Sequence, residues 1–109
     1  MTTQLLPAKR LLNTIAGYAE VYPVRHEGGF LLSRCVTPGY YDLWRHDPAR
    51  CDWHLVGGIM PNTVLHTFEV WGQGDYRYDE DGNLLMAEPV FAEDFGDAYA
   101  YLWDKRHTF

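Results

Sequence analysis

The chain has 109 residues, a length typical of one domain, and 47% of them are apolar, which excludes a disordered chain. Its net charge of −6 argues against a nucleic-acid binder, which has to neutralise phosphates, and against an anionic membrane surface as partner. Two cysteines are too few for a disulfide scaffold and no apolar run approaches the length of a membrane span, so we expect a cytoplasmic protein with reduced thiols.

The first predicted element is a helix over residues 5–16. Leu11, Leu12 and Ile15 recur at helical spacing, and Gly17 suits the position just after a helix end. A helix this short is marginal by itself. The pattern therefore predicts a helix that is stabilised by packing its apolar side on the rest of the domain.

A run of short strands is predicted next. Residues 18–25 and 30–36 flank a turn with two glycines, which predicts a hairpin. Pro23 places the first of these strands at a sheet edge, because proline cannot donate to a ladder. Two further strands are expected over 40–46 and 52–56, separated by an Asp-Pro turn.

The second half of the predicted sheet is broken by glycines. Two glycines and Pro61 predict a loop over 57–62, and residues 63–71 then alternate as the clearest strand, with His66 on its apolar face. The Asp-Gly step within 79–83 predicts a further hairpin.

The last predicted element is a helix over residues 93–106, because Phe95, Ala98 and Leu102 form one apolar stripe. Short hairpin connections imply antiparallel pairing. The chain is therefore predicted to be a single α+β domain over 1–109. Its expected architecture is a two-layer sandwich, in which an antiparallel sheet of about five to seven short strands is flanked by an N-terminal and a C-terminal helix.

Charge is distributed unevenly along the chain. Residues 1–74 are neutral overall, whereas residues 75–109 hold nine acids against three bases, with aromatic side chains interleaved. Acidity is also typical of ordinary soluble domains. However, carboxylates speed the encounter with a basic partner, and neighbouring aromatic side chains can anchor it once bound. The combination favours docking of a basic surface. We expect a non-catalytic interaction module, of accessory, inhibitor or immunity type, whose partner is a protein with a basic surface, for example a nucleic-acid-binding protein. The predicted partner-binding residues are Asp75, Asp79, Glu80, Asp81, Glu88, Glu93, Asp94, Asp97, Tyr101 and Asp104.

An alternative interpretation is a small-molecule-binding or enzymatic domain. It requires a concave pocket in which titratable groups converge, with His66 as a base and Cys35 as a nucleophile. The expected pocket residues are Trp44, Trp53, His54, His66 and Trp71.

Metal-binding signatures are incomplete. Cys51 and His54 have ligand-like spacing, but residues three apart on a strand point to opposite faces, and no second pair is present to complete a zinc signature. The acidic run 79–83 lacks the ligand spacing of a calcium loop. We therefore expect no metal, no cofactor and no catalytic residues.

Overall fold

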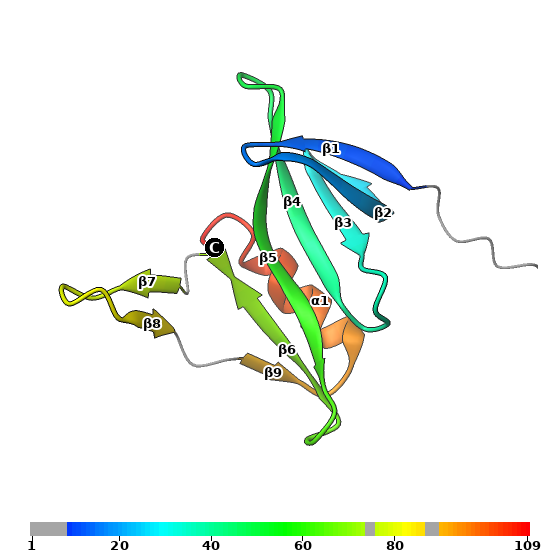
Figure 1. The fold of residues 1–109 in the computed structure, drawn as a ribbon. Helices are drawn as coiled ribbons and strands as arrows, with labels where there is room; N and C mark the ends of the chain where they lie inside the picture. The colour runs from blue at the N-terminus through cyan, green and yellow to red at the C-terminus, as the bar shows by residue number, and fades with distance from the viewer. Residues whose placement is uncertain (1–8, 74–75, 87–89) are drawn as a thin grey trace, which may run out of the picture.

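The fold is a strongly curved antiparallel sheet with one C-terminal helix packed on it (Figure 1). The computed structural model describes residues 9–73, 76–86 and 90–109. The large sheet contains β1 (Arg10–Thr14), β2 (Gly17–Glu27), β3 (Phe30–Arg34), β4 (Tyr41–Asp47), β5 (Asp52–Asn62), β6 (Thr67–Gly72) and β9 (Val90–Ala92). A separate hairpin is formed by β7 (Tyr76–Tyr78) and β8 (Leu84–Met86), and the helix is α1 (Phe95–Asp104).

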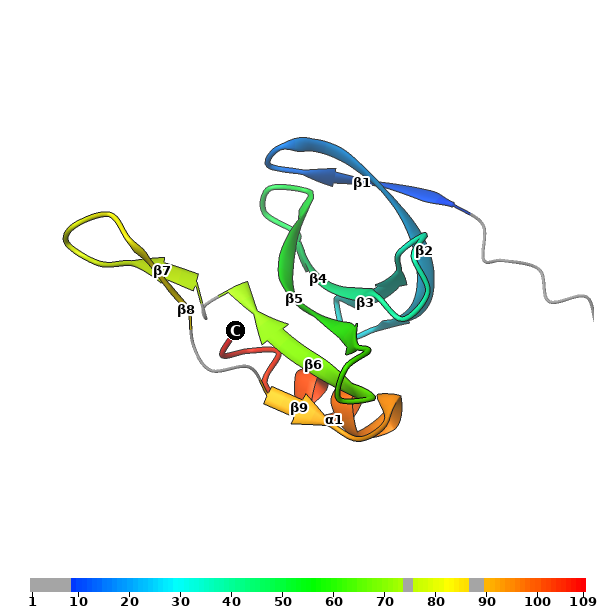
Figure 2. The ribbon, with the colours of Figure 1, turned by 60° about the horizontal axis from the view of Figure 1, so that its bottom comes forward.

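The seven strands of the large sheet do not lie flat. They pair antiparallel in the order β1-β2-β3-β4-β5-β6-β9, and β1 also meets β5 in a parallel bridge between Thr14 and Trp53. This bridge closes the first five strands into a small barrel, which Figure 2 shows as a ring. Strands β6 and β9 extend from the second half of β5, and α1 packs on them.

Two apolar clusters fill the two faces of β3 and β4. In β3, Leu31 points into the barrel whereas Phe30 and Leu32 point toward α1, because successive side chains of a strand alternate between faces. The buried residues of the barrel cluster are Leu12, Val21, Leu31, Trp44 and Trp53. The buried residues of the helix cluster are Phe30, Leu32, Leu43, Val56, Ile59, Val70, Ala98 and Leu102.

The predicted C-terminal helix is confirmed. Asp94 caps it, since its Oδ1 accepts a hydrogen bond of 2.8 Å from the backbone N–H of Asp97. Ala98 and Leu102 are 0% exposed and face the sheet. At ten residues α1 is too short to cross a bilayer, and none of the described ranges contains a helix that is long and apolar enough to do so.

The predicted N-terminal helix is wrong. Residues 1–8 lie outside the described residues, and the rest of the expected helix forms β1 and its turn. Leu12 is 0% exposed inside the barrel, whereas its neighbour Leu11 is 59% exposed. A short apolar run is compatible with both the helical and the strand repeat, and pairing with β2 stabilises the strand. Over the ranges that the structure describes, one helix, not two, packs on the antiparallel sheet.

The prediction that Pro23 marks a sheet edge is also wrong. Its strand β2 lies between β1 and β3. The register shifts between Pro23 and Arg25, so that Val24 is the additional residue of a bulge. A bulge tolerates a missing N–H inside a sheet, and it bends the strand toward barrel closure.

The predicted loop at 57–62 and the start of the next strand are wrong as well. Strand β5 continues to Asn62, and the chain turns only at 63–66, where His66 has φ +55°. Gly57 has a packing role: a Cβ there would lie 2.3 Å from the Trp71 carbonyl oxygen and 3.2 Å from Leu102 Cδ1. The glycine that suggested a turn is thus needed for close approach of β6 and α1.

Candidate functional site

The predicted acidic surface is divided between two separate places. Figures 1 and 2 both show the β7–β8 hairpin projecting away from the sheet and well separated from α1. Asp75 and Glu88 lie outside the described residues. The turn of the hairpin carries Asp79, Glu80 and Asp81, whereas α1 and its N-terminal approach carry Glu93, Asp94, Asp97, Tyr101 and Asp104.

The hairpin turn uses one of its three carboxylates for its own structure. Asp79 Oδ1 accepts hydrogen bonds from the backbone N–H groups of Asp81, at 2.9 Å, and Asn83, at 2.8 Å. An Asp side chain that bonds its own backbone stabilises a turn. Glu80 and Asp81 are exposed. Two carboxylates of this turn are therefore accessible to a partner.

Three further accessible carboxylates lie in and just before α1: Asp97 and Asp104 are exposed residues of the helix, and Glu93 is exposed directly before its cap. This set is called the exposed acidic side of α1. Asp94 is committed to the helix cap. Tyr101 is half-buried, with its ring 6.4 Å from that of Phe109, so it packs within the domain rather than projecting as an anchor.

The larger aromatic side chains of α1 are occupied by cations of the chain itself. The Arg25 guanidinium lies 5.5 Å from the ring centre of Tyr99, and the Arg106 guanidinium lies 4.2 Å from that of Trp103. Phe95, Tyr99 and Trp103 also pack against the helix cluster. The aromatic side chains of α1 therefore serve mainly the core, whereas Tyr78 and Phe91, which precede the helix, are exposed.

The five residues of the alternative aromatic pocket are not brought together. Trp44 and Trp53 fill the barrel, where the Trp44 indole N–H donates to Ser33 Oγ at 3.0 Å. His66 is exposed in the turn before β6. Trp71 packs so closely on Gly58 that a Cβ there would lie 2.7 Å from its ring.

Cys35 is unsuited to the nucleophilic role considered above. Burial, the charge of Asp42 and a hydrogen bond from its Sγ to Asp42 Oδ2, 3.4 Å away, raise the pKa of the thiol to about 11. At neutral pH the group is therefore a thiol, and the thiolate is the reactive form. His66 lies in an exposed turn, so the structure offers no desolvated base in that position.

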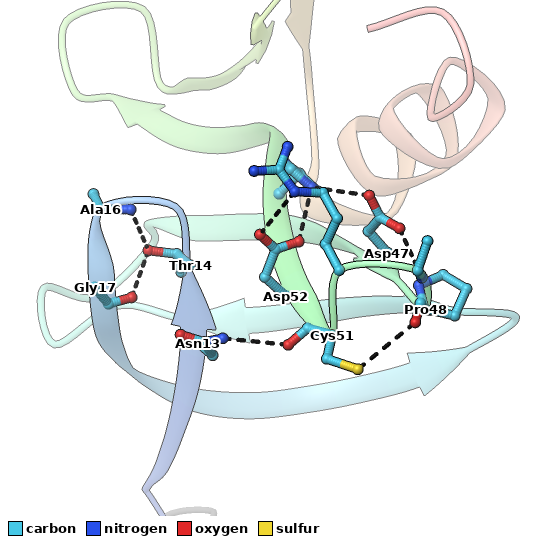
Figure 3. Close-up of polar contacts among 11 residues, drawn as sticks. Asn13, Thr14, Ala16, Gly17, Asp47, Pro48, Cys51 and Asp52 are labelled. Carbon is cyan, nitrogen blue, oxygen red and sulfur yellow. Dashed lines mark hydrogen bonds and ion pairs between the residues drawn. The ribbon is translucent and has the colours of Figure 1, made fainter.

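A polar cluster that the sequence did not predict lies where β4 turns into β5. Asp47 and Asp52 are directly opposed in the antiparallel pair, and His54 follows two residues later on the same face (Figure 3 shows the two carboxylates). His54 Nε2 lies 3.0 Å from Asp52 Oδ1 and 3.5 Å from Asp47 Oδ2. Asn13 Nδ2 donates to the Cys51 carbonyl at 3.3 Å and ties β1 to the same turn.

Charge in this polar cluster is weakly compensated. Arg50 Nε is 3.9 Å from Asp52 Oδ2, and the Arg50 side chain is 59% exposed. Asp52 itself is 6% exposed. Desolvation raises the pKa of Asp47, but hydrogen bonds from the backbone N–H groups of Ala49 and Arg50, together with His54, bring it below its usual value. Two carboxylates thus stand side by side, one of them buried.

A small pocket lies beside His54. It measures about 140 Å³, and its lining side chains include two guanidinium groups and two imidazoles. The Arg106 guanidinium also stacks on the Trp103 ring, and this contact fixes its position at the pocket. The lining residues are Arg45, His54, Leu55, Val56, Arg106, His107 and Phe109. His54 was predicted to line a pocket, but none of the other predicted pocket residues lines this one.

The pattern that could have revealed the polar cluster is an Asp-x-His step on a strand. Residues two apart share a face, so Asp52 and His54 point the same way. The third member, Asp47, becomes visible once the hairpin register is known. Reading the segment for Cys and His spacing alone missed both carboxylates.

No family model matches the chain, and no match was found among curated proteins or among solved structures.

Proposed function

We propose that this protein is a non-catalytic interaction module that docks a basic surface of a partner protein through the exposed acidic side of α1. The carboxylates of this surface belong to Glu93, Asp97 and Asp104. The observation that carries the proposal is the exposure of these carboxylates: Asp97 and Asp104 lie on the outer side of a helix whose inner side is buried through Ala98 and Leu102. Glu93 is exposed just before the helix cap.

The helix presents these charges in a form suited to docking. Gly96 and Ala100 are exposed between them, so small residues separate the carboxylates and leave them accessible. Within the described residues, none of the three takes part in an ion pair. Charges held on a packed helix and free of internal partners raise the association rate with an opposite charge and fix its orientation.

The experiment compares two double charge reversals that change net charge equally. The first, the α1 variant, combines Glu93→Lys just before the helix cap with Asp97→Lys in the first turn of α1. The second, the hairpin variant, combines Glu80→Lys with Asp81→Lys on the hairpin turn. Asp94 stays unchanged because it caps the helix. The α1 substitutions are expected to cost folding about 0.3–1 kcal/mol each through the helix dipole, which circular dichroism and melting will report.

Tagged wild-type protein and both variants serve as bait in cross-linked capture from the native host, with elution by rising salt. We expect the α1 variant to lose basic partners or release them at lower salt, because reversed charges repel a cationic surface. The hairpin variant should retain them. An α1 variant that folds and captures the wild-type partners with unchanged salt resistance would refute the proposal.

The second candidate function is binding of a small anionic ligand in the pocket beside His54. Arg45 and Arg106 supply the guanidinium groups that anions prefer, and His54 and His107 add imidazoles. Arg45 is exposed, so Arg45→Gln tests the pocket with little risk to the fold. If the α1 variant still captures the wild-type partners while Arg45→Gln abolishes binding of a small anion, the pocket is the functional site.

A further inference from the structure

We propose that Asp47, Asp52 and His54 form a binding site for a divalent first-row transition-metal ion. The site lies at the end of the β4–β5 hairpin and is independent of the acidic side of α1. One potential ligand atom from each of the three residues lies within 4.8 Å of the others.

The hairpin register creates a demand for positive charge at this position. Asp47 and Asp52 are opposite each other across the β4–β5 pair. Like charges directly opposite in a sheet are destabilising. Burial of Asp52, at 6% exposure, increases that cost because solvent screens it less. Arg50 approaches from the turn at 3.9 Å with a largely exposed side chain, so it offsets little of the repulsion.

Two buried atoms of the cluster have no hydrogen-bond partner among the described residues. They are Asp52 Oδ1 and His54 Nε2, which are shielded from solvent and lie 3.0 Å from each other. Buried polar atoms are nearly always satisfied by a protein group, a water or an ion. A carboxylate oxygen carries lone pairs, and Nε2 presents one in the Nδ1–H tautomer of histidine, so a cation would satisfy the two atoms together.

The distances from His54 to the two carboxylates match those between ligands of one ion. Metal bonds of about 2.0–2.2 Å place neighbouring ligand atoms roughly 2.8–3.6 Å apart at angles between octahedral and tetrahedral values. His54 Nε2 is 3.0 Å from Asp52 Oδ1 and 3.5 Å from Asp47 Oδ2. The three ligand atoms all lie within 4.8 Å of one another, so binding would require at most a small closing movement of the two carboxylates.

A protonated His54 held between the two carboxylates is the competing arrangement. A charged N–H donor aligns with its acceptor. His54 Nε2 is not aligned for a hydrogen bond with Asp52 Oδ1, although the two atoms are only 3.0 Å apart. Two ligands of one ion show this off-axis contact, because each lone pair points to the ion and not to the other ligand. The geometry thus favours the metal site over the ion pair.

The donor set indicates the class of ion. Two carboxylates and one imidazole suit borderline ions such as Zn²⁺, Mn²⁺, Fe²⁺ or Co²⁺, whereas Ca²⁺ and Mg²⁺ prefer oxygen ligands alone. Two negative charges balance one divalent ion. Three protein ligands leave further coordination positions for water or for an exogenous ligand.

The test titrates Co²⁺ into chelator-treated full-length protein and follows the visible d–d absorption of the ion. Asp52→Asn and His54→Gln remove one ligand each with little change in shape. Asp97→Asn and His66→Gln are the matched controls, since they make the same chemical changes at exposed positions outside the cluster. We expect saturable Co²⁺ absorption in the wild type, weakened affinity by about tenfold or more in both cluster variants, and wild-type behaviour in both controls.

Wild-type protein without saturable Co²⁺ absorption, or cluster variants that bind as tightly as the wild type, would overturn the proposal. A second measurement needs no variant, in case Asp52→Asn fails to fold. Substoichiometric Mn²⁺ should broaden the NMR signals of the His54 ring before those of His66, because paramagnetic broadening falls steeply with distance. Broadening that begins elsewhere would equally exclude the site.

Discussion

The dependence of the fold on α1 is tested by Leu102→Ala. Leu102 is 0% exposed in the helix cluster, and its Cδ1 lies so close to Gly57 that a Cβ there would be 3.2 Å away. The substitution leaves a cavity, and the backbone on one side of it limits how far the cavity can collapse. The loss of unfolding free energy should therefore lie in the upper part of the usual range, about 3–4 kcal/mol. With an unfolding entropy of about 230 cal/mol/K for 109 residues, the melting temperature should fall by roughly 13–17 °C.

Leu65→Ala is the matched control, because it deletes the same atoms from a side chain that is 57% exposed. Its effect should stay within about 0.5 kcal/mol, or roughly 2 °C. Differential scanning calorimetry measures both variants in one buffer. Equal shifts for the two substitutions, or a loss below about 1 kcal/mol at Leu102, would show that α1 is not part of the cooperative core.

Two further predictions concern the helix cap and the thiols. Asp94→Ala should cost about 1 kcal/mol in chemical denaturation, because it leaves the Asp97 N–H without its acceptor, whereas Asp97→Ala should cost less; equal losses would contradict the capping role. With a chromogenic disulfide reagent at pH 8, the exposed Cys51 should react first. Cys35 should react roughly tenfold more slowly than an unshifted thiol. Its pKa is raised from 9.0 to about 11, which lowers the thiolate fraction about 100-fold. The greater nucleophilicity of the more basic thiolate offsets part of this loss. A single fast phase for both thiols, or a slow phase abolished by Cys51→Ser, would refute this.

Part of the proposed docking surface could be predicted from residue order. The apolar stripe through Phe95, Ala98 and Leu102 fixes which side of the helix is buried, so Asp97 and Asp104 follow as exposed. The cap role of Asp94 is visible in the same segment as an Asp before a helical pattern. The separation of this helix from the acidic hairpin was not predictable, because it depends on how β6 and β9 join the sheet.

The Asp47, Asp52 and His54 cluster illustrates the opposite case. Its members lie within eight residues, yet their convergence depends on which residue of β4 faces which residue of β5. A shift of the register by one residue would turn the side chains of one strand to the other face. Composition carries no information about that register.

Residue order alone determined the local elements: the hairpin turn at 26–29, the Asp-Gly hairpin turn and the capped C-terminal helix, because turn chemistry and helical periodicity act over a few residues. The tertiary structure decided the rest. Residues 10–14 form a strand because β2 and β5 offer ladder partners, and Gly57 lies within a strand because Leu102 packs on it. Pairing and packing between residues distant in the chain override local preference whenever the same short apolar pattern fits two periods.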